Sequence, residues 1–430
     1  MLYGNCIIPD DTTSCDSLAI TTAIQAALRT GVNCIRIPKK DPYWNIESAI
    51  LLPSNITVYL DDCVLRLADG VFDNIFRNEN MYKEETYTTD GEQKNIRIIG
   101  LGHPVLDGGI HNGLTERTSN KNGMPDIRKN NLILLHNVSD YVLENFQCIH
   151  MRWWAINQLY CRNGHLSRLS FFNGTLAPNQ DGINLRLGCN QILIENISGR
   201  TGDDTVALTA LGKSRDKQFS VTGKDNDIHD ITIRDVTAST KQTIVALRCC
   251  DGAQLYRVHI ENIRDAESDY RPWGVVRIGE NDYYRERSAI MGEIREITVR
   301  NVYSRGLGTI FLAAALQDSH ISDVYASGDT MYAVSTYFPT RVHEETGCSN
   351  FGGVSLKNVV IENIFYSGCA THSEKDWLYT YLDQEFSGCA LDFRCLREND
   401  TFTNTIFRNI FTDAGQALVM VADGVDYQLF

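Results

Sequence analysis

The chain has 430 residues, of which 43% are hydrophobic and 22% are charged, and its formal net charge is −14 at pH 7. A chain of this length buries a large core, and its negative charge disfavours a nucleic-acid partner, because phosphate binding requires an excess of Lys and Arg. No uninterrupted run of about 18 apolar residues occurs, so the sequence predicts no membrane span.

The N-terminal residues and the cysteines predict the compartment. Residues 1–17 lack the basic and apolar regions of a signal peptide. The 13 cysteines have no paired metal-type spacing, so we expect free thiols in a reducing cytoplasm. We expect no metal and no cofactor. A secreted protein whose leader has been removed would begin in the same way, and this is the alternative.

The first predicted element is a helix. The segment DSLAITTAIQAALRTG has Asp16 or Ser17 as its candidate N-cap and ends at Gly31. Helical periodicity is nearly absent after residue 30, and β-rich segments replace it. We expect the helix to lie in an N-terminal cap, about residues 1–45, of a single domain that spans 1–430.

One short phrase recurs along the rest of the chain. Each copy is an alternating strand of about six residues that ends in a polar or Gly-rich turn, and most copies carry Asn or Asp at the fifth position. The copies are YVLENF (141–146), ILIENI (192–197), ITIRDV (231–236), VHIENI (258–263), ITVRNV (297–302), VVIENI (359–364) and TIFRNI (405–410), with a weaker copy, LSRLSF, at 166–171.

The spacing of these copies predicts a solenoid. Ser170 and Asn196 follow Asn145, and Asn262 follows Asp235, at nearly constant steps along the chain. These steps are shorter than a β-propeller blade, and the Leu-rich template of a leucine-rich repeat is missing. We therefore predict an all-β fold, a parallel β-helix, in which the recurring Asn or Asp forms an amide ladder between coils.

Two segments that begin with Asp are predicted to lie one coil apart. Alignment of DGINLR, from Asp181, with DTVALT, from Asp204, superposes their apolar positions and brings these two aspartates together, with Asp203 adjoining. Neighbouring coils lie about 4.8 Å apart, so the three carboxylates form one cluster. Crowded like charges cost stability, which favours an acid–base site over aspartates that only form turns.

The same register predicts arginine side chains on the face that carries the acids. VALRC (245–249) and VVRIG (275–279) follow as further coils, and polar inserts at 212–227, 264–273 and 280–293 are typical of the walls of a binding groove. Aromatic residues of the inserts either stack on sugar rings or pack the loop bases. The substrate-binding candidates here are Arg186, Arg248, Arg277, Trp273, Tyr283 and Tyr284.

Three motifs in this order resemble those of the polygalacturonases, pectin-degrading glycoside hydrolases with a single-stranded right-handed parallel β-helix. NQDGINL (179–185) is similar to the family's Asn-Thr-Asp-Gly-Ile-Asp, TGDDTVAL (201–208) to its Gly-Asp-Asp, and VVRIG to its Arg-Ile-Lys. The segments TTAIQAAL, LPSNITVYLDDCVL, NIRIIGLGHPVLDGGI and MRWWAINQLYC follow the family's order, so the resemblance covers nearly the whole chain.

The resemblance implies an inverting, metal-independent hydrolase of a pectic or related oligosaccharide. Asp204 would protonate the glycosidic oxygen, while Asp181 and Asp203 would activate the attacking water. Arg277 would bind the substrate at the cleavage subsite, and Asn179 and Gln242 complete the expected binding set. Without an export signal, short imported oligosaccharides and exo-action are favoured.

Two departures from the family bear on the substrate. No His occurs at 241–243, where the family's Gly-His-Gly should fall, and Gly279 stands in place of the Lys of Arg-Ile-Lys. Arg248 is predicted to lie one coil from Gly279, and we expect it to supply the missing cation. Two other functions stay open, a uronate lyase or epimerase and a sugar-binding β-helix without activity.

Overall fold

The computed structural model describes most of the chain, which its contacts divide into two compact units. Unit 1 comprises Met1–Val206 and Gln218–Asp225, and unit 2 comprises Ala207–Lys217 and Asn226–Phe430. The described residues are 6–111, 131–173, 179–212, 219–240, 242–266, 272–279, 287–336, 354–368, 388–393, 399–413, 417–421 and 428–429. The single domain over 1–430 stays a prediction.

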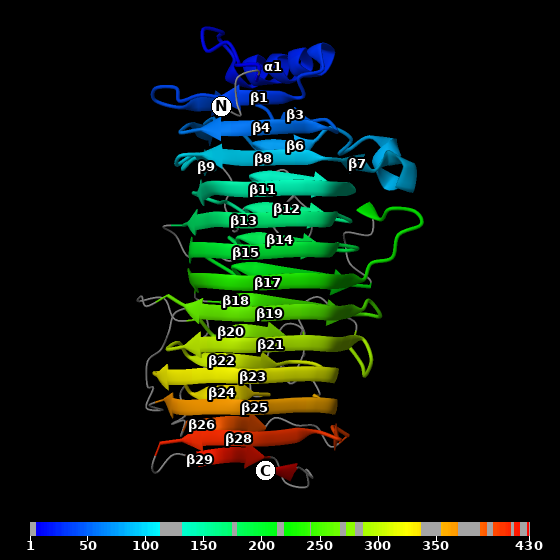
Figure 1. Cartoon of the computed structure of the whole chain (residues 1–430), viewed down its shortest axis with the longest axis vertical. Coiled ribbons are helices and arrows are strands. Elements are labelled where there is room, and N and C mark those ends of the chain that lie inside the picture. The colour runs from blue at the N-terminus through cyan, green and yellow to red at the C-terminus, as the bar shows by residue number, and fades with distance from the viewer. Residues whose placement is uncertain are drawn as a thin grey trace. The chain divides into compact units, whose positions relative to one another are not determined.

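Unit 1 begins with the predicted helix, α1 (Asp16–Thr30), labelled in Figure 1. Gly31 ends it in the left-handed conformation, with φ of 71°, as a residue without a Cβ does most readily. The N-cap is Cys15, so the prediction of Asp16 or Ser17 was wrong by one or two positions. The carboxylate of Asp16 instead accepts a hydrogen bond from the Asn45 backbone (2.7 Å), which ties the helix to the first coils.

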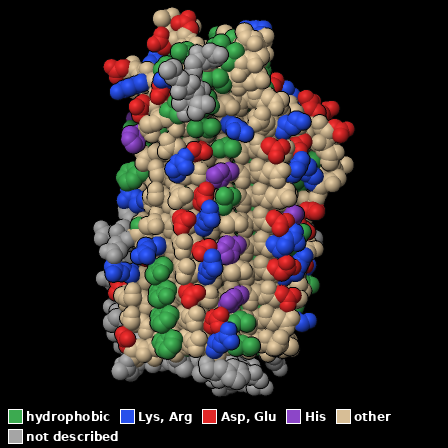
Figure 2. All heavy atoms as spheres, in the orientation of Figure 1, with side chains coloured by type: hydrophobic (Ala, Val, Ile, Leu, Met, Phe, Trp, Pro, Cys, Tyr) green, Lys and Arg blue, Asp and Glu red, His purple; other side chains and the backbone are tan. Residues whose placement is uncertain are grey.

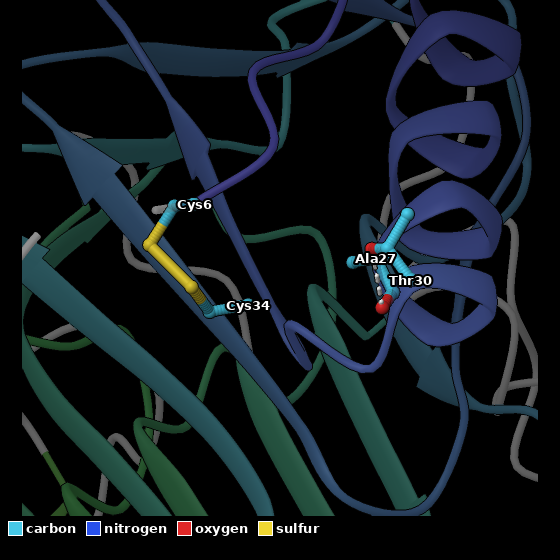
Figure 3. Close-up of a disulfide and its surroundings, with 4 residues drawn as sticks. All are labelled: Cys6, Ala27, Thr30 and Cys34. Atoms are coloured by element: carbon cyan, nitrogen blue, oxygen red, sulfur yellow. Dashed lines mark hydrogen bonds between the residues drawn. A yellow bond between two sulfur atoms is a disulfide. The ribbon is translucent and has the colours of Figure 1, made fainter. Parts of the chain in front are cut away.

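A disulfide joins Cys6, ahead of α1, to Cys34 on the first strand (Figure 3). Figure 3 also shows the last turn of α1, where the Thr30 hydroxyl donates to the Ala27 carbonyl (3.2 Å). The expectation of free thiols is therefore wrong for this pair. Eight further cysteines among the described residues are free.

Two sheets of parallel strands build unit 1, as the repeat predicted. Long strands, with shorter ones ahead of them, make one sheet, the long-strand sheet, and strands of three to six residues make the other, the short-strand sheet. The long-strand sheet contains β1 (Cys34–Ile37), β2 (Trp44–Ile46), β4 (Ile56–Asp61), β5 (Val64–Leu67), β7 (Gln93–Lys94), β8 (Ile96–Leu101), β9 (Val105–Asp107), β11 (Val138–Ile149), β13 (Arg162–Phe172) and β15 (Asn190–Arg200). The short-strand sheet contains β3 (Ile50–Leu52), β6 (Phe76–Asn78), β10 (Ile133–His136), β12 (Ile156–Leu159) and β14 (Ile183–Arg186), and β16 (Val206–Leu211) begins at the boundary of the unit.

A small polar layer lies beside these coils in unit 1. It consists of two 3₁₀ turns, η1 (Glu84–Tyr87) and η2 (Thr89–Gly91), and the segment 219–225. His136, fully buried at the end of β10, bonds through its two ring nitrogens to the Thr86 hydroxyl (2.9 Å) and the Phe219 carbonyl (2.7 Å). This layer thus covers one end of the short strands.

Unit 2 repeats the two-sheet plan. Its long-strand sheet contains β17 (Ile228–Ser239), β19 (Leu255–Asp265), β21 (Ile294–Ser304), β23 (Leu316–Gly328), β25 (Leu356–Gly368), β27 (Phe402–Thr403), β28 (Ile406–Thr412) and β30 (Gln428–Leu429). Its short-strand sheet contains β18 (Thr243–Cys250), β20 (Gly274–Ile278), β22 (Gly308–Leu312), β24 (Tyr332–Ser335), β26 (Cys389–Phe393) and β29 (Ala417–Val421). The parallel pairing in both units confirms the predicted parallel β-helix.

The recurring Asn and Asp side chains occupy bends in the long strands of unit 2. At each such bend φ lies near +55°, a conformation that Asn and Asp tolerate better than most residues. Asn262 donates to Asp235 (2.9 Å), and Asn301 donates to Asn262 (3.1 Å). Farther along, Asn363 donates to Asp323 (3.0 Å), and Asn409 to Asn363 (3.0 Å). The predicted amide ladder is confirmed.

Two details of the predicted repeat were wrong. In unit 1, strand pairing places Arg168, not Ser170, at the ladder position beside Asn145, so this coil is two positions shorter than predicted. Arg168 adopts the same left-handed bend, with φ of 53°, and forms an ion pair with Glu144 instead of an amide bond. In unit 2, Asp323 marks a complete coil that the phrase search missed, because its segment reads ISDVYA.

Candidate active site

Backbone hydrogen bonds bring Asp181 and Asp204 together within unit 1. Gly182 donates its N–H to the carbonyl of Asp204 (3.0 Å), and Ile183 donates to that of Thr205 (2.9 Å). This is the parallel register between DGINLR and DTVALT that the sequence predicts. The two aspartates therefore occupy the same position on adjacent coils, about 4.8 Å apart along the stack.

The turn ahead of β16 fixes the third carboxylate. One oxygen of Asp203 accepts a hydrogen bond from the backbone of Asn179 (2.6 Å), and the other accepts one from the backbone of Asp204 (3.0 Å). The Thr201 hydroxyl closes the turn by donating to the Asp203 carbonyl (2.6 Å). The turn chemistry that competed with catalysis in the sequence analysis is thus real for Asp203, and it also holds that carboxylate next to Asp204.

Burial distinguishes the three acids. The exposed fraction is 4% for Asp181 and 1% for Asp204, whereas Asp203 is half-buried. Aspartates are almost never buried to this extent unless other groups partner them, because transfer of a charge out of water is costly. The deep pair and the shallower neighbour therefore have different environments, which is how carboxylates of one site come to serve different roles.

A line of buried amides leads to Asp181. Asn184 on β14 donates its side-chain N–H to Asp181 (3.1 Å) and pairs in register with Asn157 on β12. Asn157 in turn donates to the side chain of Asn131 (3.1 Å), and all three amides are at most 2% exposed. Asn157 and Asn131 were not among the residues predicted from the sequence. Their signal was Asn within or next to short apolar strands, as in INQL (156–159) and NLILL (131–135).

Two predicted binding residues join the acids in unit 1. Asn179 is 6% exposed and anchors Asp203, as described above. Arg186 at the end of β14 is 8% exposed, and its guanidinium carbon lies 4.4 Å from the ring centroid of Trp154. Arginine binds planar carboxylates and vicinal hydroxyls well, so the arrangement provides acid–base groups together with a cation.

The other arginine candidates lie in unit 2. Arg277 on β20 pairs in register with Ala246 on β18, and Gly279 donates its N–H to Leu247 (2.7 Å). This register places Arg248 beside Gly279, as the sequence predicted. Both arginines are half-buried.

Gln242 and Trp273 lie one coil apart in unit 2, where the Trp273 N–H donates to the Gln242 carbonyl (2.9 Å). Both are half-buried. Tyr283 and Tyr284 lie outside the described residues. The structure thus groups the three aspartates with Asn179 and Arg186 in unit 1, and it pairs the remaining described candidates in unit 2.

Within the described part of the chain, no group of three or more His, Cys, Asp or Glu side chains is arranged to hold a metal ion. No helix in the same residues has the length and apolar character needed to cross a bilayer.

Comparison with known proteins gives no match in sequence and clear matches in structure. No family model matches the chain, and no curated protein does. The polygalacturonase of Erwinia carotovora is similar in structure with a TM-score of 0.52 and 12% identity, over 98% of this chain and 96% of that one. The chain has a polygalacturonase-like parallel β-helix fold.

Two other structures show how widely this fold is shared. The A-module of a mannuronan C-5 epimerase from Azotobacter vinelandii has a TM-score of 0.57 and 12% identity, over 97% of each chain. The tailspike of Escherichia coli bacteriophage HK620, solved with a pentasaccharide, has a TM-score of 0.57 and 13% identity, over 98% of this chain and 76% of that one. The fold alone therefore does not choose between hydrolysis, epimerisation and binding.

Proposed function

We propose that the protein is a glycoside hydrolase that cleaves a pectic or related oligosaccharide by acid–base catalysis. The observation that carries this proposal is the pairing of Asp181 with Asp204, two buried carboxylates on adjacent coils with Asp203 beside them. Two buried carboxylates are costly in a purely structural role, whereas glycoside hydrolysis requires a pair of carboxyl groups.

Each acid has a proposed role in a single inverting displacement. Asp204 donates its proton to the glycosidic oxygen as the bond from that oxygen to the anomeric carbon breaks. Water attacks the anomeric carbon from the opposite face of the ring, and its proton passes to Asp181 or Asp203. The hydrogen bond from Asn184 orients Asp181. The hydrogen bonds from the Asn179 and Asp204 backbone hold the Asp203 carboxylate next to Asp204.

The remaining candidates are proposed to bind the sugar. Arg186 and Asn179 lie with the acids in unit 1. Arg248, Arg277 and Gln242 in unit 2 stay predictions, as does the replacement of the family's lysine by Arg248. Their test is the effect of each Ala variant on the Michaelis constant for acidic and neutral oligosaccharides.

The test of the proposal is an assay for new reducing ends. The full chain is incubated with a panel of pectic and neutral oligosaccharides, and Asp204→Asn serves as the blank. We expect at least one substrate to yield reducing ends with the wild type, and the variant to release them at least about 100-fold more slowly. Equal release by both proteins would contradict the proposed role of Asp204.

Two further readouts separate the alternative functions. A lyase would produce an unsaturated uronate that absorbs ultraviolet light, and an epimerase would change the sugar without releasing reducing ends. Loss of activity in EDTA would favour a cation-dependent lyase or epimerase, because such uronate chemistry commonly uses Ca²⁺. A sugar-binding protein would hold its ligand without turnover in both the wild type and the Asp204→Asn variant.

A further inference from the structure

Trp154 belongs to the same column as the buried acids. The Ala155 N–H donates to the carbonyl of Asp181 (2.9 Å), which places Trp154 beside Asp181 on the preceding coil. Asp181 in turn lies beside Asp204 on the following coil. Unit 1 therefore carries an indole and two carboxylates in consecutive coils at one position of the repeat.

The backbone and the ring of Trp154 are both held in place. Its carbonyl accepts a hydrogen bond from the buried side chain of Asn131 (2.9 Å). Trp153 is 1% exposed and packs into the core, with its ring centroid 5.7 Å from that of Trp154. Trp154 is half-buried, whereas Trp153 is buried, so part of Trp154 stays accessible to a ligand.

Arg186 covers one face of the Trp154 ring. The guanidinium carbon lies 4.4 Å from the ring centroid, and the Arg186 side chain is almost fully buried. A cation–π contact is stronger when the cation is removed from water. The contact fixes the plane of the indole and keeps a cation beside it.

We propose that Trp154 is the stacking platform of a sugar subsite next to the acid pair, and that Arg186 is its positioning residue. The ligand is a pyranose ring of the oligosaccharide chain, which presents a face of C–H groups to the indole. The spacing of about 4.8 Å between coils is comparable to one sugar unit, so the stacked ring neighbours the ring that is cleaved. This inference rests on the proposed function for the role of the acids.

The test combines binding and kinetics, with trigalacturonate as the acidic probe and maltotriose as the neutral one. Calorimetry and reducing-end assays are carried out on the full chain with Trp154→Ala and Trp154→Phe. We expect Trp154→Ala to weaken binding and to raise KM by about tenfold or more, with little change in kcat, since the stacked ring is not the one that reacts. Trp154→Phe keeps an aromatic face and should recover most of the affinity.

Two other variants separate stacking from structural roles. Arg186→Met should raise KM by less than Trp154→Ala does, because the Trp154 ring stays but its plane is no longer fixed. Arg186→Lys should give a KM between those of the wild type and Arg186→Met. The matched control is Tyr43→Ala, because Tyr43 also has an arginine over its ring. The guanidinium carbon of Arg66 lies 5.0 Å from the Tyr43 ring centroid, outside the column of Trp154, Asp181 and Asp204. This control should bind trigalacturonate like the wild type. If Trp154→Ala lowers the midpoint of thermal unfolding, Trp154→Leu replaces it.

The outcomes distinguish the subsite from the hydrolase. Unchanged binding and KM in Trp154→Ala, with Asp204→Asn inactive, would overturn the subsite and leave the proposed function in place. Weakened binding in Trp154→Ala, with no hydrolysis by the wild type or by any variant, would support the subsite and overturn the proposed hydrolase activity. Failure of the wild type to bind either trigalacturonate or the neutral trisaccharide maltotriose would overturn both.

Discussion

The long strands of unit 2 and the short strands β10, β12 and β14 of unit 1 differ in where their polar side chains lie. In unit 2 the long strands alternate buried and accessible residues. Ion pairs form across neighbouring coils on the accessible face, where Figure 2 shows acidic and basic side chains. Glu362, for example, accepts hydrogen bonds from His320 (2.8 Å) and from Arg408. In unit 1 every residue of the short strands β10, β12 and β14 is buried, including polar ones.

The difference shows where polar residues need a functional explanation. Ion pairs on the long-strand face stay in contact with water, so their charges lose little hydration and the pairs add little to stability. Their presence therefore needs no functional explanation. Buried carboxylates and amides beside the short strands are costly, and a fold whose repeat already supplies its core does not need them. Asp181 and Asp204 therefore carry the functional proposal, whereas the charges on the other sheet do not.

Exchange of one carboxylate on each sheet tests this comparison with the largest expected effect. Asp204→Asn should reduce kcat by about 10²–10⁴-fold, because the general acid is lost, while relief of like-charge crowding keeps the thermal midpoint or raises it. Glu362→Gln should do the reverse, with unchanged kcat and a stability loss of at most about 1 kcal/mol. The release of reducing ends measures kcat for both variants. Equal losses of kcat in the two variants would contradict the functional difference between the two sheets.

The amide ladder of unit 2 should give a smaller, purely structural effect. Asn262→Ala removes the hydrogen bonds to Asp235 and Asn301. It also places alanine, which has no polar side-chain group, at a φ of 56°. We expect urea denaturation to show a loss of about 1–3 kcal/mol in the free energy of unfolding. Asn262→Gly should lose less, because glycine adopts this conformation freely. Identical losses for both variants would argue against backbone strain as a cause.

Glu92 of unit 1 should make stability depend on pH. Burial opposes its ionisation, but Arg162 and Lys224 outweigh burial and hold the pKa of Glu92 at about 2. Because this pKa is lowered, its stabilisation is complete above the ordinary value of 4.5 and is lost as pH falls toward about 2. Glu92→Gln should thus lower the thermal midpoint at pH 7, and the gap to the wild type should narrow below pH 4.5. A gap that stays constant from pH 7 to pH 3 would contradict this pKa.

The smallest effect is expected for Arg408→Ala on the long-strand face. Arg408 pairs with Glu362 and is about half exposed. Its removal should change the free energy of unfolding only slightly, and less in high salt, where exposed ion pairs are screened. Denaturation curves at low and high salt provide the measurement. A large loss of stability that does not depend on salt would contradict the small contribution expected of ion pairs on this face.

The sequence predicted the repeat well because its signal is local. Asn and Asp at left-handed bends recur with the coil, and alignment of two short segments was enough to bring Asp181 to Asp204. It failed at Arg168, where an arginine occupies the bend, and at Asp323, whose coil lacks the usual phrase. In both cases pairing across the stack, which no single segment encodes, determined the register.

The candidate site was predicted less completely than the fold. The carboxylates were found because like charges crowd in one motif, but Asn157, Asn131 and Trp154 carry no such local signal. Their importance comes from burial and from contacts one coil away, such as that of Arg186 with Trp154. Sequence alone gives the type of these residues and not their surroundings.

A double-mutant cycle on Asp181 and Asp204 tests the central claim most directly. The quantity to measure is kcat/KM for Asp181→Asn, Asp204→Asn and the variant with both substitutions, on the best substrate of the oligosaccharide panel. If the two form one catalytic centre, the double variant should lose little more activity than the worse single variant, because each loss already disables the same step. Losses that multiply, or two single variants with wild-type activity, would contradict the claim.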